Sequence, residues 1–145
     1  MYSFRNAIPA DFPGIQKILD RVSLPVDGVQ SHLQNFLVYE TAGEIVACGG
    51  FEAYFPAVLV RSVAVLPAYR GKGIGQNLIR TLLEKFRAEQ FKKVFLLTFD
   101  AEEYFQRHFG FQAVNRFQAP PAIRNSVEFI TACPQSAICM VKYLV

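Results

Sequence analysis

The chain has 145 residues, of which 52% are hydrophobic and 14% aromatic, so it is long and apolar enough to bury a core. A formal net charge of +3 suits a small anionic ligand. It argues against a nucleic-acid surface, which needs a denser cluster of basic side chains. We therefore expect one globular domain over residues 1–145.

Three cysteines, Cys48, Cys133 and Cys139, are an odd number without CxxC spacing. This argues against a disulfide framework or a zinc site and favours a reducing compartment. The N-terminal residues MYSFRNAIPADF carry charges and prolines where a secretion signal needs an apolar block, and no apolar run approaches the ~20 residues of a membrane span. We expect a soluble cytoplasmic protein that binds no metal, nucleic acid or membrane.

Hydrophobic periodicity and turn residues predict the elements in chain order. The first half contains a strand at 2–7, a helix at 9–22, a short helix at 29–33, a hairpin at 35–54 and a strand at 57–66. The second half contains a helix at 74–89, a strand at 92–99, a helix at 100–109, a strand at 110–117 and a strand at 136–145. Few of these connections favour parallel pairing, so the pattern predicts an α+β fold around a largely antiparallel sheet.

The helix at 74–89 carries one apolar stripe, formed by Ile74, Leu78, Ile79, Leu82, Leu83 and Phe86. The helix at 100–109 begins after Asp100, which we expect to cap it. Cys139 alternates with apolar residues on the last strand and is expected in the core. For Cys133 we favour a small buried side chain over a nucleophile or an arsenic-binding thiol.

A glycine-rich turn precedes the helix at 74–89, in the stretch SVAVLPAYRGKGIGQNLIRTLLEKF at 62–86. Unpaired amides and the helix dipole make a helix N-terminus attractive to anions, and glycines allow a phosphate to come close to the backbone. The turn matches neither the Walker P-loop nor the G-x-G-x-x-G dinucleotide fingerprint. It therefore predicts another kind of phosphate site, with a tight turn into a packed helix as the alternative.

The string VAVLPAYRGKGIG, with its Arg-x-x-Gly-x-Gly spacing, resembles the GNAT superfamily of acetyl-CoA-dependent N-acetyltransferases. The resemblance implies a mixed sheet of about six to seven strands flanked by about four helices. It also implies acetyl-CoA as co-substrate, with the pyrophosphate on the turn and the pantetheine arm along the preceding strand. The positions that match are Val63, Ala64, Val65, Arg70, Gly71, Lys72, Gly73, Ile74 and Gly75.

The C-terminal stretch APPAIRNSVEFITACPQSAICM, with LVRSVAV and SLP, is similar to the GNAT branch associated with arsenic-resistance operons. That branch is similar in turn to N-acetylglutamate-synthase-like acetyltransferases, and some relatives acetylate arsinothricin. The resemblance implies a small amino-acid-like acceptor, glutamate-like in shape, with arsinothricin and phosphinothricin as candidates. Paired chains are common among relatives, which leaves a homodimer open.

Acetyl transfer to an amine needs a proton acceptor, a polarised carbonyl and a proton for the departing thiolate. GNAT enzymes usually attack directly, and a splayed or bulged strand holds the carbonyl, for which Val65 is the best match. Glu52 is the first candidate base, with a solvated strand-end glutamate as the alternative, and Glu128 is the second or binds the acceptor ammonium. Tyr104 is the candidate acid, with a packing aromatic as the alternative. Phe109 adds one residue before Gly110, so the position where relatives often carry the tyrosine acid falls on Phe105 or Gln106 instead.

An acidic or amino-acid acceptor calls for arginine. Arg61 stands among apolar residues on the predicted strand and is the residue we expect to bind the acceptor, with Ser62 beside it. Thr98 and Ser126 are further acceptor-site candidates. Arg116 and Arg124 lie in the C-terminal region that closes over acceptors in relatives.

Two other functions stay open at this point. One is a different acceptor: a polyamine, an aminoglycoside or a protein N-terminus. The other is an acetyl-CoA-binding sensor without turnover, which the irregular segment YFQRHFGF keeps in consideration.

Overall fold

The structure is a computed structural model that describes residues 2–132 and 136–144, with the side chains of 131 and 132 left out. One sheet runs through the molecule in the strand order β1-β2-β3-β4-β5-β7-β6. Its strands are β1 (Arg5–Asn6), β2 (Leu37–Thr41), β3 (Glu44–Tyr54), β4 (Ala57–Val65), β5 (Lys93–Thr98), β6 (Gln112–Val114) and β7 (Ile138–Tyr143). Only β4 and β5 pair in parallel, so the predicted mixed and mostly antiparallel sheet is confirmed.

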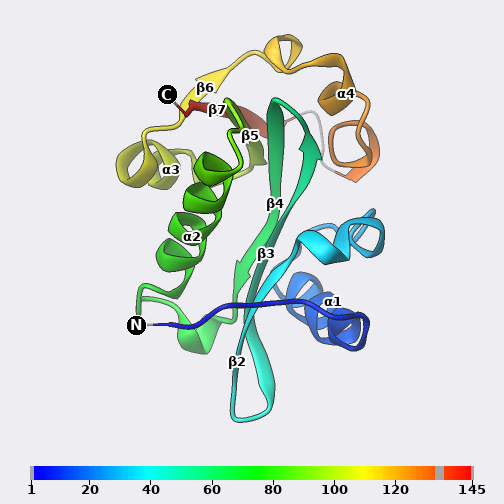
Figure 1. Cartoon of the computed structure of the whole chain (residues 1–145). Helices are drawn as coiled ribbons and strands as arrows, with labels where there is room; N and C mark the ends of the chain where they lie inside the picture. The colour runs from blue at the N-terminus through cyan, green and yellow to red at the C-terminus, as the bar shows by residue number, and fades with distance from the viewer. Residues whose placement is uncertain (1, 133–135, 145) are drawn as a thin grey trace.

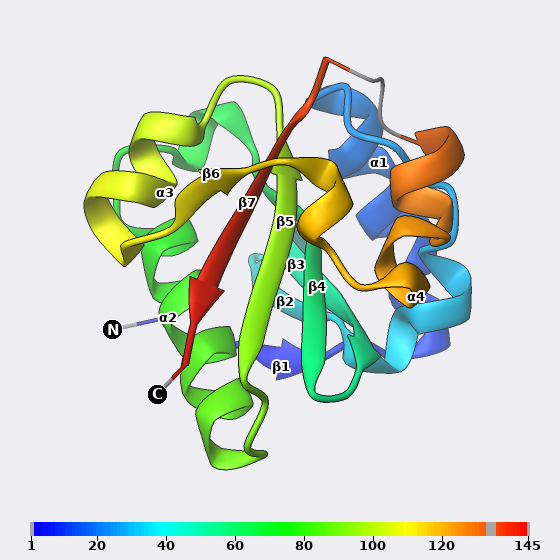
Figure 2. The same ribbon diagram turned by 90° about the horizontal axis from the view of Figure 1, so that it is seen from above.

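The helices cover both faces of this sheet, with α2 and α3 on one face and α1 and α4 on the other (Figures 1 and 2). The α-helices are α1 (Phe12–Arg21), α2 (Ile74–Ala88), α3 (Glu102–Phe109) and α4 (Pro121–Arg124). Shorter helical turns are η1 (Pro9–Asp11), η2 (Gln30–Asn35), η3 (Pro67–Tyr69), η4 (Arg116–Gln118) and η5 (Glu128–Ala132), the last with π geometry.

The two faces hold different cores because alternate strand residues point to opposite sides. Under α2 and α3 lies one apolar cluster, which contains the whole predicted stripe of α2 except Ile74 and Leu78, both also buried. The other face holds two clusters, one under α1 and η2 and one under α4 and η5. Polar side chains that point to this second face between the two clusters therefore have apolar residues as neighbours.

Two consecutive glycines let both layers approach β3 closely. A Cβ at Gly49 would lie 2.8 Å from Leu78 Cδ2 of α2, and one at Gly50 would overlap the Phe36 ring on the opposite face. Since real Cβ contacts do not reach such distances, neither position accepts a side chain without displacing its neighbour.

Strands β4 and β5 pair only at their beginnings, where Ala57–Leu59 lies beside Lys93–Phe95. Beyond Leu59 the two strands have no pairing with each other, which leaves one edge of β4 open. A bulge lies in the same stretch, because Ser62 and Val63 both stand opposite Gly49 of β3. Ser62 has φ +61° there, so the expectation of a splayed and bulged strand is confirmed.

The start of α3 differs from the prediction. Its N-cap is Ala101 and not Asp100, and no side chain caps the helix; instead the Thr98 hydroxyl accepts a hydrogen bond from the Ala101 amide at 3.0 Å. The Thr98 hydroxyl at the end of β5 thus accepts the hydrogen bond that we expected the Asp100 carboxylate to accept. The assignment of Asp100 as a cap was therefore wrong.

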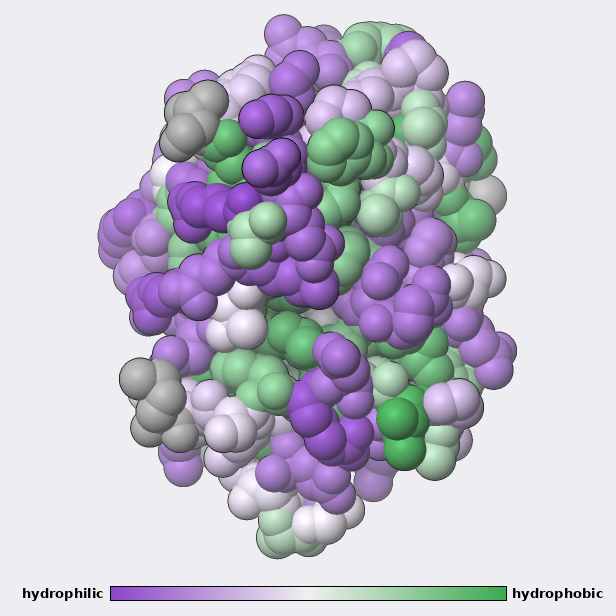
Figure 3. Space-filling view, viewed as in Figure 1, coloured by the Kyte–Doolittle hydropathy of each residue, from purple (hydrophilic) through white to green (hydrophobic). Residues whose placement is uncertain are grey.

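Hydrophilic side chains prevail on the face seen in Figure 3, with hydrophobic ones in small groups. Over the described part of the chain, none of the helices combines the length and apolar character that crossing a membrane requires.

Candidate active site

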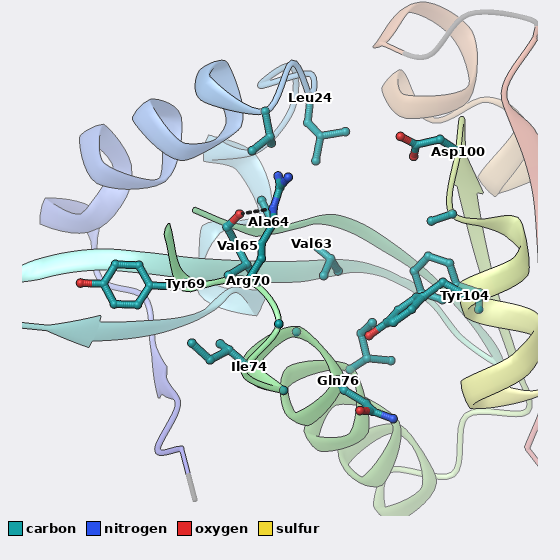
Figure 4. A pocket seen from close by; sticks show the side chains of 17 residues that line it. Leu24, Val63, Ala64, Val65, Tyr69, Arg70, Ile74, Gln76, Asp100 and Tyr104 are labelled. Carbon is teal, nitrogen blue, oxygen red and sulfur yellow. Dashed lines mark hydrogen bonds between the residues drawn. The ribbon is translucent and has the colours of Figure 1, made fainter. Parts of the chain in front are cut away.

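A cleft of about 600 Å³ lies where the end of β4 meets the start of α2 and the start of α3 (Figure 4). Most of the residues predicted to bind the cofactor line it: Val63, Ala64, Val65, Arg70, Gly71, Gly73, Ile74 and Gly75. Lys72 is absent from the lining. Its carbonyl accepts a hydrogen bond from the Tyr2 hydroxyl at 2.6 Å, and its ammonium lies 5.6 Å from the centre of the Tyr69 ring.

The turn before α2 has the backbone of an anion site. Gly71 and Gly73 have φ of +78° and +83°, a region that other residues enter only with strain, and Gly73 is the N-cap of the 15-residue α2. No acidic residue occupies the first turn of α2, so nothing there competes for its free amides. These amides, together with Arg70, make the floor of the cleft suitable for a pyrophosphate.

The open edge of β4 supplies backbone groups to the same cleft. The Leu66 amide donates to the Val46 carbonyl, so by antiparallel alternation the Val65 amide points away from β3, towards the open side. The Val65 carbonyl accepts a hydrogen bond from Arg70 Nε at 3.1 Å. Because the bulge lies at Ser62 and Val63, the Val63 amide is a second candidate for holding an acetyl carbonyl, one that the sequence did not reveal.

Tyr104 forms the far wall of the cleft with Phe105 and the Asp100–Ala101 turn. Burial raises the pKa of the Tyr104 phenol, with a smaller opposing effect of Arg80, so the phenol keeps its proton at neutral pH. Phe109, the additional residue before Gly110, is buried in the core, and Gly110 ends α3 in the left-handed region at φ +74°. The insertion therefore adds a core contact at the end of the helix and leaves Tyr104 on the cleft.

A buried ionic cluster lies on the opposite face of the sheet, between the two apolar clusters. Arg61 Nη1 donates to Glu52 Oε2 at 2.9 Å, and Arg61 Nη2 lies 3.3 Å from Glu128 Oε1. Arg61 Nε donates to the Ser62 hydroxyl at 3.0 Å. Glu52 is only 2% exposed, so the alternative of a solvated strand-end glutamate is wrong.

Two further residues reach Glu52, and the sequence analysis assigned neither of them a role. The Tyr54 hydroxyl donates to Glu52 Oε1 at 2.5 Å, and burial raises the pKa of that phenol further than the glutamate does. His32 Nε2 lies 3.6 Å from the same oxygen. Tyr54 stands two residues after Glu52 on the same strand face, which is the one signal that could have placed it there.

A small cavity of about 80 Å³ lies beside the cleft and is lined in part by this cluster. Arg61, Ser62 and Glu128 line it, together with apolar residues of which Leu24, Val63 and Phe105 also line the cleft. Glu52 does not line the cavity. Of the two candidate carboxylates, Glu128 is therefore the one that an acceptor in this cavity would meet first.

Thr98 and Ser126 line neither the cleft nor the cavity. Both are buried, and both use their hydroxyls on the backbone: Thr98 accepts from the Ala101 amide, and Ser126 donates to the Ile123 carbonyl at 2.6 Å. The structure thus gives these two predicted acceptor residues a role at the ends of local turns.

Cys48 and Cys139 are buried free thiols, and burial raises their pKa to about 12 and about 11. The expected core position of Cys139 is confirmed. Cys133 lies outside the described residues. Within residues 2–132 and 136–144, the structure has no group of three or more His, Cys, Asp or Glu residues that could hold a metal ion.

Known proteins resemble this chain in sequence and in fold. Residues 3–111 match the family described as "Acetyltransferase (GNAT) family". The chain belongs to the GNAT family. An amino-acid acetyltransferase of Mycobacterium tuberculosis is 34% identical over 120 residues, which cover 76% of this GNAT chain and 68% of that relative. An uncharacterised N-acetyltransferase of Chlorobaculum tepidum, CT2212, is 28% identical over 97% of this chain and 95% of its own.

Solved structures agree with this assignment. Rv2747 of Mycobacterium tuberculosis, in complex with CoA and NLQ, superimposes with a TM-score of 0.81 at 26% identity and is matched over 99% of both chains. The N-acetylglutamate synthase of Neisseria gonorrhoeae, complexed with coenzyme A and N-acetyl-glutamate, gives a TM-score of 0.85 at 20% identity. This GNAT chain spans only 35% of that synthase, whose likeness therefore concerns the fold.

The protein is thus an acetyl-CoA-dependent N-acetyltransferase with relatives among the amino-acid acetyltransferases. The resemblance to the arsenic-resistance branch finds no counterpart among these relatives.

Proposed function

We propose that this enzyme transfers acetyl to the amine of a small amino-acid-like acceptor, glutamate-like in shape, of which phosphinothricin and arsinothricin are candidates. One observation carries the proposal: a guanidinium and a carboxylate, Arg61 and Glu128, line the same small cavity beside the cleft. An amino acid also carries both signs of charge on one carbon. Such a cavity therefore matches its carboxylate and its ammonium together.

Acetyl-CoA occupies the large cleft in this proposal. Its pyrophosphate lies on the amides of the Gly71–Gly75 turn beside Arg70, and its pantetheine arm runs along the open edge of β4. The thioester carbonyl then accepts from the amides of Val63 or Val65. This direction of binding brings the acetyl group to the end of the cleft that adjoins Arg61 and Glu128.

Arg61 can hold a carboxylate although it is already paired. Its Nη2 is buried near Glu128 and forms no hydrogen bond among the described residues, so it keeps an unused donor for the acceptor carboxylate. Glu128 accepts the proton of the acceptor ammonium, directly or through water, and Glu52 fixes the guanidinium from behind.

The chemical step joins the acceptor nitrogen to the acetyl carbon and breaks the carbon–sulfur bond of the thioester. The lone pair of the nitrogen becomes the new carbon–nitrogen bond, and the sulfur leaves as thiolate. The nitrogen then releases its second proton to leave a neutral amide, and this proton replaces the one that Tyr104 gives to the sulfur. Tyr104, which holds its proton at neutral pH, returns a proton to the sulfur to give the free thiol of CoA.

The test is CoA release from acetyl-CoA, followed with a thiol reagent and confirmed by mass spectrometry of the product. The panel contains glutamate, phosphinothricin, arsinothricin, spermidine and kanamycin. Turnover restricted to the amino-acid-like acceptors is the expected result. Turnover of the polyamine or the aminoglycoside alone contradicts the acceptor class.

Two variants localise the acceptor. Glu128→Gln and Arg61→Lys should raise the acceptor KM or lower kcat by about 10²-fold while changing the KM for acetyl-CoA less than threefold. Glu103→Gln, on an exposed carboxylate of α3 away from both cavities, is the matched control and should behave like the wild type.

The second candidate function is an acetyl-CoA sensor. The structure weakens its main support, since Phe109 is absorbed by the core and Tyr104 still lines the cleft. Acetyl-CoA binding without thiol release across the whole panel would favour it.

The size of the acceptor cavity, about 80 Å³, favours a small acceptor over an aminoglycoside or a protein N-terminus.

A further inference from the structure

A second large cavity, of about 630 Å³, lies at the C-terminal end of the sheet among β6, α4, η5 and β7. It shares none of its described lining residues with the cleft or with the acceptor cavity. Its lining consists of Val114, Asn115, Arg116, Phe117, Arg124, Phe129, Ile130, Ala137, Ile138 and Cys139. This cavity has no role in the function proposed above.

Arg124 lines the cavity without a partner of its own. Its Nε is buried and makes no hydrogen bond, and no ion pair of this side chain is found in the described part of the structure. A buried guanidinium nitrogen that has lost water and gained no acceptor costs free energy. A ligand oxygen at this position would remove that cost.

Arg116 brings a second guanidinium to the same cavity and is held in place. Its Nη2 donates to the Ala137 carbonyl at 3.3 Å, and its guanidinium lies 5.6 Å from the centre of the Phe129 ring. The charge of Arg116 also acts on the neighbouring thiol, where it opposes the rise in the pKa of Cys139. Among the described lining residues none is acidic, so two positive charges face the cavity together.

The remaining walls are apolar. Phe129 and Cys139 form a buried floor, whereas Phe117 and Ile130 are 79% and 57% exposed at the cavity. Ligand pockets typically combine apolar walls with a few fixed polar groups and have volumes of roughly 300–1,000 Å³. Exposed apolar side chains beside two guanidinium groups are typical of a site for a molecule with an anionic head and an apolar body.

We propose that this cavity is a second binding site of the protein, which takes a small organic acid. The carboxylate or phosphate head lies between Arg116 and Arg124, where guanidinium groups can hold two oxygens at once, and the apolar body lies against Phe117 and Ile130. The site is separate from acetyl transfer and does not depend on the acceptor proposed above.

The experiment is a titration of the full chain with 3-phenylpropanoate, with phenyl phosphate and with the neutral 3-phenylpropanamide. Saturating CoA is present throughout, so that the glycine turn of the cleft is not free to bind the anions. Calorimetry gives the dissociation constants, and amide chemical shifts identify the segment that responds. We expect saturable binding of at least one anion with shifts centred on residues 115–130, and no saturation with the amide.

Arg124→Gln should weaken this binding about tenfold or more, because the anion loses a charge-assisted hydrogen bond. Since the Arg124 side chain makes no hydrogen bond or ion pair within residues 2–132 and 136–144, the variant should fold normally. Arg116→Lys keeps the charge but loses the planar fork, and should weaken binding as well. Arg107→Gln, at an exposed arginine of α3, is the matched control and should leave the dissociation constant unchanged.

The two anions distinguish a carboxylate from a phosphate headgroup, and preference for either supports the site. Equal binding of the neutral amide overturns the proposal, as does anion binding that Arg124→Gln and Arg116→Lys leave unchanged. Absence of saturation with both anions up to about 20 mM overturns it too, because two desolvated charge-assisted hydrogen bonds should give a dissociation constant below that.

Discussion

Arg61 lies between Glu52 and Glu128 on one face of the sheet, with no exposed side-chain surface. Two carboxylates share one guanidinium there, and His32 lies 3.6 Å from Glu52. If the guanidinium is removed, both carboxylates stay buried without their counter-ion. The stability of the fold and the proposed binding of the acceptor therefore depend on the same side chain.

We predict that Arg61→Met lowers the free energy of unfolding by about 3–5 kcal/mol, the usual cost of leaving a buried charge without its partner. Urea denaturation followed by circular dichroism measures the change. The double variant Arg61→Met with Glu52→Gln should recover part of the loss, since one of the stranded charges is gone. Arg107→Met, which breaks an exposed ion pair, should cost less than about 1 kcal/mol.

A second ion pair predicts how stability depends on pH. The side-chain hydrogen bonds of Arg5 hold the pKa of Asp11 below its usual value, which burial alone would raise. The folded state therefore releases this proton at lower pH than the unfolded chain does, whose carboxyl titrates near pH ~3.9. The resulting stability is present above that pH and is lost as the pH falls through the folded pKa.

Asp11→Asn should accordingly be less stable than the wild type at pH 7 by about 1–3 kcal/mol, the range for a hydrogen bond to a charged group. The difference should shrink steadily below about pH 4. Urea midpoints measured from pH 2 to pH 7 check the trend. A difference that stays constant over this range would contradict it, and Asp20→Asn, at an exposed residue of α1, provides the comparison.

The sequence identified some of these residues and missed others for a physical reason. An arginine within an apolar strand pattern already singled out Arg61, as the residue expected to bind the acceptor, and Glu52 was singled out as the candidate base. Their contact depends on the register of β3 and β4, which includes a bulge that no local pattern predicts. His32 was missed for a similar reason, because only the η2 turn brings it to Glu52. Tyr54 stands two residues after Glu52 on the same strand, so the strand pattern offered its position although the sequence analysis gave it no role.

At the scale of elements, the turn into α2 offers a comparison within the same chain. Gly71 and Gly43 both have left-handed backbones, with φ of +78° and +76°, and an added Cβ would meet no atom within 4 Å at either position. Gly71 lines the cleft, whereas Gly43 lies in the turn between β2 and β3. A substituted residue would therefore meet the same backbone strain at both positions, but only Gly71 lies at the cleft.

We predict that Gly71→Ala and Gly43→Ala each cost about 1–2 kcal/mol of stability, the penalty for an L-residue in this backbone region. Only Gly71→Ala should also weaken acetyl-CoA binding, by about tenfold, since its methyl group stands where the pyrophosphate approaches the amides. Calorimetric titration of both variants with acetyl-CoA measures the difference. Equal affinities would show that this turn does not bind the pyrophosphate.

The helices and strands were largely predictable because their periodicity is strong. The stripe of α2 is buried as expected, and every predicted strand occurs. The residues that cap the ends of the helices were harder to predict from the sequence. At α3 the Ala101 amide bonds to the Thr98 hydroxyl of the preceding strand, a local choice that composition does not separate from a cap by Asp100.

At the scale of the molecule, the sheet has two parts joined by a short seam. The strands β1 to β4 meet β5, β7 and β6 only where Ala57–Leu59 pairs with Lys93–Phe95. The cleft lies where this seam opens, and residues of β4, α2 and α3 line it from both sides. A ligand that fills the cleft would therefore hold the two parts together.

Acetyl-CoA should raise the melting temperature. At a concentration 100 times its dissociation constant, a ligand adds about 2.7 kcal/mol, which for a chain of this size corresponds to roughly 6–10 °C. Adenosine 3′,5′-bisphosphate, which lacks the pantetheine arm, should bind more weakly and give a smaller shift at equal concentration. Scanning calorimetry checks both. An equal shift with the bisphosphate would mean that the arm makes no contact with β4.

Gly49 has a consequence for the evolution of this protein. It stands opposite the bulge of β4, and a Cβ there would come within 2.8 Å of Leu78 in α2 and 3.2 Å of Val63. The absent side chain thus lets α2, which begins at the glycine turn, pack close to the bulged part of β4. A lineage that acquired even alanine here would move α2 away from β4, and would have to reshape α2 to keep the turn and the strand at the distance that the proposed binding of acetyl-CoA uses.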